Sequence, residues 1–221
     1  GDAHSGVNAW ATILGGDYPS SSDATLDIPP ITLSASKPYA MMSFWHWYYI
    51  ETNYDGGNVK VSTDGGATWD VVEPFGGYDG TARSGNAGIP GEPCFTGYNN
   101  NFWQEELFDL SAYAGQQVMV RFHFGSDGSV QRSGWYIDDV RLRSTDTDDL
   151  PPIISNVVVP QSTFDSVGPY EVSCTVTDPL SGVDAVTLFY STDDGATYTA
   201  QRMGPGSEPF DWTISIRGLP N

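Results

Sequence analysis

The alternation of side chains in residues 117–124 (QVMVRFHF) constrains the fold of this chain more than any other feature. Its even-numbered positions all carry valine or phenylalanine, and its odd-numbered positions carry mixed side chains such as Arg121 and His123. Successive side chains of a strand point to opposite faces, whereas a helix repeats every 3.6 residues, so the pattern predicts a strand with one buried face. No long stretch has the periodicity of a helix. Further strands are expected over residues 40–50, 58–62, 69–72, 103–110 and 135–142.

A linker is expected near Asp149, because residues 144–152 (STDTDDLPP) are polar, acidic and end in two prolines. It separates a first domain over residues 1–145 from a second domain over residues 150–221. The second domain has short apolar stretches at residues 153–159, 170–177, 185–191 and 212–216, spaced like the strands of a small sandwich. We therefore predict an all-β chain made of two β-sandwiches.

A local repeat links the two domains. Residues 62–69 (STDGGATW) and 191–198 (STDDGATY) both fit the pattern S-x-D-x-G-x-T-[W/Y], known as an Asp-box. In such a turn the Asp side chain accepts bonds from backbone amides, and glycine supplies a positive φ. In sialidases this pattern lies away from the catalytic residues. We therefore interpret both copies as structural turns of hairpins and not as catalytic sites.

The net charge of −19 excludes some classes of partner. Nine basic residues offer no patch for a nucleic-acid backbone or for anionic lipid. No apolar run reaches the roughly 18 residues of a membrane span, so membrane insertion is not expected. Clustered carboxylates suit hard cations such as Ca²⁺, while the alternative interpretation is a solvated acidic surface.

Catalytic motifs are missing from the sequence. It contains neither HExxH nor GxSxG, and His4, His46 and His123 are interpreted as packed or hydrogen-bonded histidines. A catalytic pair of carboxylates of the glycosidase type stays an alternative, because 28 acidic residues offer many pairs. We predict that the chain is not an enzyme. Cys94 and Cys174 fall in different domains and are expected to be separate thiols, with a disulfide as the alternative.

Several stretches of the first domain together resemble a known family. The most specific is residues 134–140 (GWYIDDV), and the others are residues 4–6, 8–10, 26–33, 43–48, 54–69, 108–116 and 120–124. In this order they resemble the MAM-like jelly-roll modules of bacterial secreted peptidases of the immune inhibitor A kind. The resemblance implies a jelly-roll sandwich and a non-catalytic accessory or adhesive module, secreted or at the cell surface. Such a module would bind a protein or surface partner as part of a longer parent chain.

Residues 151–221 resemble a bacterial immunoglobulin-like or fibronectin-like domain. By comparison with both families, the first strand of the jelly roll and the last strands of the second domain are expected to lie outside this chain. A sandwich without a terminal strand exposes backbone groups that a strand of another chain could pair with. One alternative function is therefore a subunit of an extracellular filament assembled by strand exchange.

The resemblance also implies a structural Ca²⁺ between an early segment and the last strand. It points to Asp139, with Asp138 as second choice, and only one of these neighbours is expected to face the core. Asp17, Asp23 and Asp27 lie in a segment rich in oxygen donors and are added to this site. A second, weaker candidate combines Glu51, Asp55 and Asp127, whose loops meet if strands 40–50 and 117–124 run in the same direction. Ordinary turn chemistry is the preferred interpretation of that second group.

Aromatic residues occupy both faces of residues 44–49 (FWHWYY), and one face must line the core. If Trp45, Trp47 and Tyr49 lie outside and open, they would suit stacking on a sugar, and a carbohydrate-binding module becomes the alternative function. Coverage of these rings by the glycine- and proline-rich loop 75–98 is the preferred interpretation.

Overall fold

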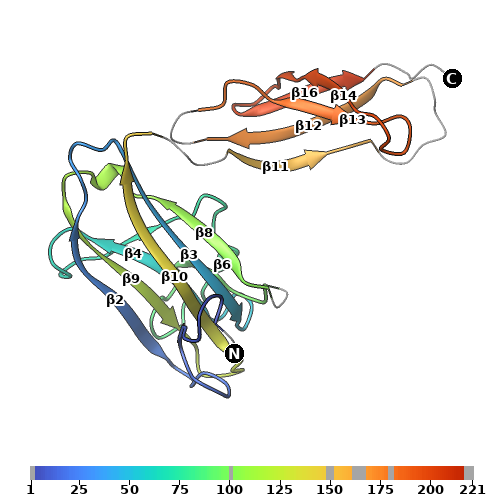
Figure 1. The fold of residues 1–221 in the computed structure, drawn as a ribbon. Helices are drawn as coiled ribbons and strands as arrows, with labels where there is room; N and C mark the ends of the chain where they lie inside the picture. The colour runs from blue at the N-terminus through green and yellow to red at the C-terminus, as the bar shows by residue number, and fades with distance from the viewer. Residues whose placement is uncertain (1–2, 100–101, 148–151, 161–167, 179–181, 217–221) are drawn as a thin grey trace. The chain divides into compact units, whose positions relative to one another are not determined.

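The computed structural model describes residues 3–99, 102–147, 152–160, 168–178 and 182–216. The chain divides into two compact units, Gly1–Thr147 and Asp148–Asn221, and each is described by itself (Figure 1). The described residues form strands and one short 3-10 helix, η1 (Ser111–Tyr113). They include no helix with the length and apolarity that a membrane crossing requires. The predicted all-β architecture is therefore confirmed.

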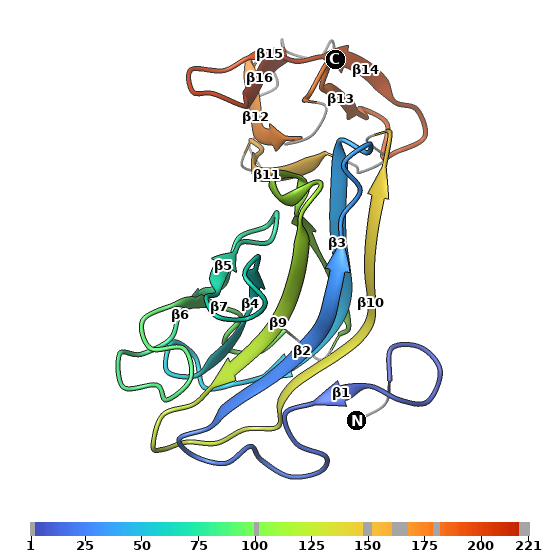
Figure 2. The ribbon, with the colours of Figure 1, turned by 90° about the vertical axis from the view of Figure 1, so that its left-hand side faces the viewer.

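Unit 1 is a sandwich of two four-stranded antiparallel sheets. The first sheet has the order β1 (Trp10–Ala11), β10 (Gly134–Thr145), β3 (Tyr39–Tyr49) and β8 (Gln104–Asp109). The second sheet has the order β2 (Asp23–Thr32), β9 (Gln117–Gly125), β4 (Gly56–Ser62) and β5 (Asp70–Val72). Early strands pair with late ones, β1 with β10, β2 with β9 and β3 with β8, as in a long hairpin rolled on itself (Figure 2). This order of strands is that of a jelly roll.

The core of unit 1 lies between the two sheets and is built largely of rings. Phe44 of β3 is fully buried and packs edge-on against Phe122 of β9, with ring centroids 4.9 Å apart, and beside Trp135 of β10. The even-numbered positions of β9 are all buried, as the alternation of residues 117–124 predicts. Alternation in β3 likewise turns Phe44 inward and Trp45 outward.

The loop between β5 and β8 carries two short strands, β6 (Gly80–Thr81) and β7 (Pro93–Cys94), which pair with each other. Cys94 is a buried free thiol, and burial raises its pKa to about 12. Cys174 is a buried free thiol of the other unit, so the two cysteines are separate, as expected.

Unit 2 contains a four-stranded antiparallel sheet and a separate hairpin. The sheet has the order β11 (Ile153–Val158), β12 (Tyr170–Thr177), β16 (Asp211–Ile216) and β15 (Gly204–Pro205), and the hairpin joins β13 (Thr187–Tyr190) to β14 (Thr199–Arg202). Its small core includes Val172, Cys174, Val176 and Ile214. The assignment of this unit to an immunoglobulin-like sandwich stays a prediction, and so do the domain limits 1–145 and 150–221.

The two repeated turns share a pair of hydrogen bonds. The carboxylate of Asp64 accepts bonds from the Thr68 amide and the Thr68 hydroxyl, at 2.9 and 2.6 Å. The carboxylate of Asp193 accepts the same pair of bonds from Thr197, at 2.8 and 2.6 Å. The Thr68 bonds hold the pKa of Asp64 well below its usual range. Each aspartate therefore closes a tight turn, which is a structural role.

The close packing of β4 on the core generates a first prediction. A Cβ atom on Gly57 would lie 2.2 Å from the Trp135 ring, and that ring is buried. Gly57→Ala should therefore destabilise unit 1 by about 1–3 kcal/mol or more, because an overpacked core must shift. Urea unfolding followed by tryptophan fluorescence measures the loss. Gly76→Ala is the matched control, since nothing lies within 4 Å of its Cβ position, and an equal effect of both variants would contradict the prediction.

Candidate functional site

A cluster of three carboxylates lies at one end of unit 1. Glu51 and Asp55 follow β3, and Asp127 follows β9 in the facing sheet. One ligand oxygen from each side chain lies within 4.8 Å of the other two. Among the residues that the structure describes, this is the one group of three or more His, Cys, Asp or Glu side chains that comes so close. The sequence predicted that the loops after β3 and β9 meet only if these two strands run in the same direction. In the structure the two loops do meet.

Asp55 is the centre of this cluster and is fully buried. Its Oδ1 accepts a hydrogen bond from the Asp127 amide at 2.6 Å, and its Oδ2 accepts one from the Tyr18 hydroxyl at 2.7 Å. The Tyr18 oxygen in turn accepts a bond from the Glu51 amide at 3.1 Å. Three segments that are distant in sequence are thus tied together through one carboxylate.

Thr96 secures the loop from the other side. Its hydroxyl donates to the backbone carbonyls of Glu51 and Asp55, at 3.1 and 2.7 Å, and accepts a bond from the Asn53 amide. Thr96 comes from the loop between β7 and β8. The turn between β3 and β4 is therefore held in one conformation, with its carboxylates directed together.

The charges of Arg132 and Arg83 lower the pKa of Glu51, but neither guanidinium forms an ion pair with the cluster. The described residues include no Lys or Arg in an ion pair with Glu51, Asp55 or Asp127. The Oε2 atom of Glu51 is buried and has no hydrogen-bond partner among the described residues. Burial, and then the charges of Asp55 and Asp127, raise the pKa of Glu51, and burial is also the main cause that raises the pKa of Asp55. Neighbouring carboxylates disfavour each other's ionised form unless a cation joins them.

The donor set fits a hard cation. Three carboxylates whose oxygens lie close together, one of them unsatisfied, are the oxygen ligands that Ca²⁺ prefers. Because hydrogen bonds already hold these loops in place, binding of an ion would require little further ordering of the backbone. Glu51, Asp55 and Asp127 are the residues that would hold the ion.

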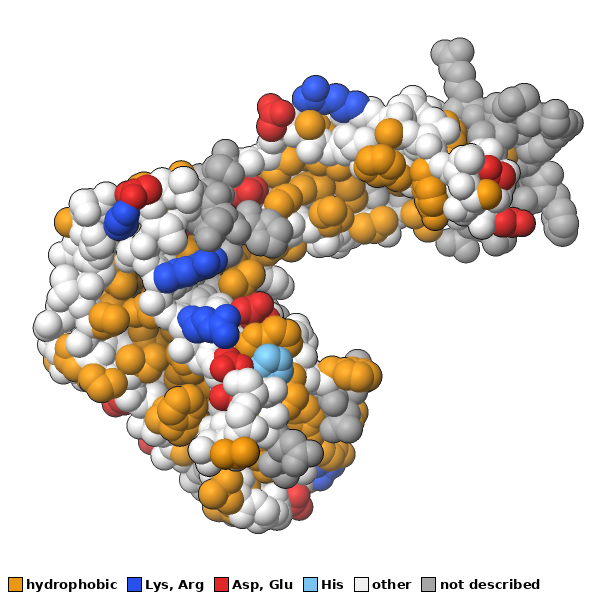
Figure 3. Space-filling model, in the orientation of Figure 1, with side chains coloured by type: hydrophobic (Ala, Val, Ile, Leu, Met, Phe, Trp, Pro, Cys, Tyr) orange, Lys and Arg blue, Asp and Glu red, His pale blue; other side chains and the backbone are white. Residues whose placement is uncertain are grey.

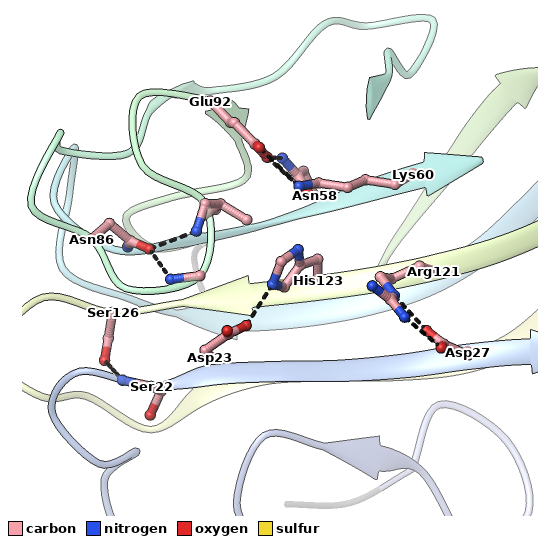
Figure 4. Close-up of polar contacts among 12 residues, drawn as sticks. Ser22, Asp23, Asp27, Asn58, Lys60, Asn86, Glu92, Arg121, His123 and Ser126 are labelled. Atoms are coloured by element: carbon pink, nitrogen blue, oxygen red, sulfur yellow. Dashed lines mark hydrogen bonds and ion pairs between the residues drawn. The ribbon is translucent and has the colours of Figure 1, made fainter. Parts of the chain in front are cut away.

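The structure does not gather the acids of the first predicted site. Asp23 contacts His123 Nε2 at 2.7 Å, and Asp27 forms two bonds of 2.7 Å with Arg121, on the outer face of the second sheet (Figure 4). The Arg121 guanidinium holds the pKa of Asp27 below its usual range. Asp17 is exposed. Cross-strand pairing with basic residues of β9 is the physical reason that Asp23 and Asp27 do not join a metal site with Asp139.

Asp138 and Asp139 break the expected alternation, because β10 bulges here. Asp139 has a φ of 49°, and the pairing with β3 shifts between Asp138 and Arg141. The bulge places both carboxylates against the N-terminal segment. Asp139 accepts bonds from the Ser5 hydroxyl at 2.8 Å and contacts His4 Nδ1 at 2.7 Å, while Asp138 accepts the Ser5 amide at 3.1 Å. Asp138 is buried and Asp139 is only half-buried, so one of the two neighbours is enclosed, as expected, while both have partners in the N-terminal segment.

The outward aromatic face of β3 is largely covered. His4 stacks on Trp45 with centroids 3.9 Å apart, and Tyr136 of β10 packs edge-on against Trp47. Tyr98, from the end of the loop, lies against Tyr49, which is 40% exposed. Loop coverage therefore applies to Tyr49, whereas cover of Trp45 by the N-terminal segment was not anticipated. Glycan binding at these rings stays a prediction.

The histidines have structural partners as well. His46 is fully buried, and its Nδ1 accepts the indole hydrogen of Trp135 at 3.2 Å. His4 and His123 contact aspartates, as described above. Tyr18 is the functional residue that sequence reasoning missed, because its contact with Asp55 spans 37 positions and no motif marks it.

The hydroxyl of Tyr18 generates a second prediction. Tyr18→Phe removes the donor to Asp55 and the acceptor for the Glu51 amide, and leaves both groups buried without that partner. We expect a loss of about 1–3 kcal/mol in the free energy of unfolding. Tyr54→Phe, at a ring that is 39% exposed, is the control and should cost far less. Similar melting of the two variants would show that the Tyr18–Asp55 bond is unimportant.

Comparison with known proteins assigns the family. The model of the family described as "Immune inhibitor A-like, MAM domain" matches residues 5–165. Bacillopeptidase F of Bacillus subtilis (strain 168) is 35% identical over 140 residues, which are 63% of this chain and 8% of that protein. Pre-pro-metalloprotease PrtV of Vibrio cholerae serotype O1 is 32% identical over 115 residues, 51% of this chain and 11% of that protein.

The chain thus spans a small part of these relatives, about a tenth of the length of each. A solved structure, the glycoside hydrolase domain of Endo-D from Streptococcus pneumoniae R6, has a TM-score of 0.34 at 15% identity over 92% of this chain and 27% of that one, too low to support an argument. The match to the family model covers most of the chain and includes the whole of the described unit 1 from Ser5. The chain therefore belongs to the immune inhibitor A-like MAM domains, which are non-catalytic accessory domains of secreted bacterial peptidases.

Proposed function

We propose that this chain is a calcium-stabilised accessory module of a longer secreted bacterial protein, in which it binds a protein partner. Its relatives are peptidases much longer than the matched region, which supports a place beside a catalytic domain. Attachment to the cell surface and an immunoglobulin-like second unit belong to the same proposal.

The observation that carries the calcium part is the unsatisfied Oε2 atom of Glu51 beside Asp55 and Asp127. A buried polar atom without a partner costs free energy, and a buried charge costs more. A bound Ca²⁺ would offset that cost and join the two loops. The ion would act on stability and loop order, since the cluster has no role in bond breaking.

A protein partner is favoured over a glycan by the state of the aromatic face. His4 and Tyr136 already pack against Trp45 and Trp47, which leaves Tyr49 and Tyr98 as the open rings of that face. Glycan binding at Trp45, Trp47 and Tyr49 is the second candidate. A glycan array would support it if binding disappeared in Tyr49→Ala and persisted in Tyr54→Ala.

Calcium should raise the melting temperature of unit 1. An ion that binds the folded form alone stabilises it by about 3–4 kcal/mol at 100 to 1,000 times its dissociation constant. Glu51→Gln should abolish most of this shift, because it removes the charge at the unsatisfied oxygen, while Asp17→Asn at an exposed site should keep it. Differential scanning calorimetry in EDTA and in CaCl₂ makes the comparison. If calcium left the melting temperature of the unsubstituted chain unchanged, the calcium site would be refuted.

The calcium effect should weaken as the pH falls from 7 to 5. The pKa values of Glu51 and Asp55 are raised in the folded state without metal, so the folded state binds these protons more tightly than the unfolded chain does. Their protonation therefore favours the metal-free folded form at low pH, and protons compete with Ca²⁺ for the oxygens. Melting curves at fixed CaCl₂ test this. A calcium shift that grows toward pH 5 would contradict it.

A further inference from the structure

His4 lies on the outer face of the first sheet, among three side chains that are distant from it in sequence. Its ring stacks flat on Trp45, with centroids 3.9 Å apart and planes at 8°, and its centroid is 5.9 Å from that of the tilted Trp103 ring. Its Nδ1 atom contacts the Asp139 carboxylate at 2.7 Å. We call Trp45, Trp103 and Asp139 the His4 site. In Figure 3 a histidine side chain reaches the surface of unit 1 beside acidic and hydrophobic side chains.

The segment that carries His4 is held to unit 1 by few contacts. None of residues 3–9, all of which the structure describes, belongs to a hydrophobic core, and residues 5–8 are exposed. Besides His4, Ser5 bonds to the β10 bulge, and β1 pairs with β10 at two positions. Segments with few buried apolar contacts open at a low free energy. His4 can therefore leave its site while the sandwich stays folded.

The contacts of His4 define the kind of group that the site accepts. A flat ring covers the indole of Trp45, and the same ring donates an N–H group to Asp139, because an ionised carboxylate only accepts hydrogen bonds. A guanidinium group combines these properties, since it is planar, stacks on aromatic faces and donates two parallel bonds to a carboxylate. Its charge adds attraction to both partners. An ammonium group is not planar, and a neutral sugar brings no positive charge.

Unit 1 already contains this arrangement on its second sheet. The Arg121 guanidinium lies 4.0 Å from the centre of the Trp69 ring and forms two bonds of 2.7 Å with Asp27, which are drawn in Figure 4. An indole, a guanidinium and a carboxylate therefore fit together on a strand surface of this protein. The net charge of −19 would also attract a basic partner toward the chain.

We infer that the His4 site binds an arginine side chain of a partner protein, and that His4 occupies the site when the partner is absent. The arginine stacks on Trp45 and donates to Asp139 in place of the histidine. Occupation by His4 weakens this binding, because only the fraction of chains with an open site can bind. The inference rests on the proposed role as a protein-binding module and names the site and the chemistry of the partner.

A peptide with a single arginine tests the inference. The probe is acetyl-Gly-Arg-Gly-amide, and the matched control replaces arginine by citrulline, which has the same flat shape without the charge. NMR spectra of the ¹⁵N-labelled 221-residue chain follow the indole N–H signals of Trp45 and Trp103. We expect the arginine peptide to shift these signals, and the citrulline peptide to bind at least about fivefold more weakly. The Trp69 signal should stay constant, because Arg121 already covers that ring.

Variants separate the occupant of the site from the groups that bind. His4→Ala should tighten binding of the arginine peptide at least about threefold, because the site is then open. Val7→Ala is the control in the same segment, at a side chain that is 89% exposed, and should leave binding unchanged. Asp139→Asn in the His4→Ala chain should remove the preference for arginine over citrulline. Asparagine tolerates the positive φ at this position, so the bulge should persist.

The inference is overturned if the Trp45 and Trp103 signals stay unchanged in the His4→Ala chain. Equal affinities of the arginine and citrulline peptides would overturn it too, and so would equal affinities of the unsubstituted and His4→Ala chains for arginine. Methyl glucoside is a further probe: if it shifts these signals and the arginine peptide does not, the rings bind a sugar and the inference is wrong. The calcium cluster shares no residue with the His4 site. A failed peptide with an intact calcium shift would therefore remove the arginine site alone.

Discussion

The burial of Asp55 is the constraint on which one end of the jelly roll depends. A fully buried carboxylate is unfavourable unless hydrogen bonds and a positive charge compensate for it. The Asp127 amide and the Tyr18 hydroxyl provide the hydrogen bonds, and these come from the β9–β10 loop and the β1–β2 loop, which are bonded to each other. No described Lys or Arg side chain forms an ion pair with the cluster, although the charges of Arg132 and Arg83 lower the pKa of Glu51.

The two outer faces of unit 1 use their side chains differently. On the second sheet, Arg121 and His123 contact acids of the neighbouring strand, and Lys60 contacts Glu92 of the loop between β6 and β7. On the first sheet, the rings of β3 are covered by the N-terminal segment and by Tyr136. Along the side of the sandwich, between β2 and β10, side chains that pack against the core also line an open groove.

Local patterns predicted the fold well, whereas contacts between distant segments limited the prediction of the site. Alternation in residues 117–124 is a local property and predicted β9 with the correct buried face. The acids Asp23 and Asp27 were grouped by their composition, but β2 pairs with β9 and brings them to His123 and Arg121. The bulge at Asp139 depends on a backbone conformation that sequence spacing does not reveal. Tyr18 was not predicted as a residue of the site, because tertiary packing alone brings it to Asp55.

A crystal structure of the chain grown in CaCl₂ tests the central claim most directly. We expect an ion bound by carboxylate oxygens of Glu51, Asp55 and Asp127, identified by its anomalous signal and by oxygen distances of about 2.4 Å, within the range of Ca²⁺ sites. The Tyr18 hydroxyl should still donate to Asp55 in that structure. Ordered density in which the three carboxylates share only water or a basic side chain, at saturating calcium, would contradict the account.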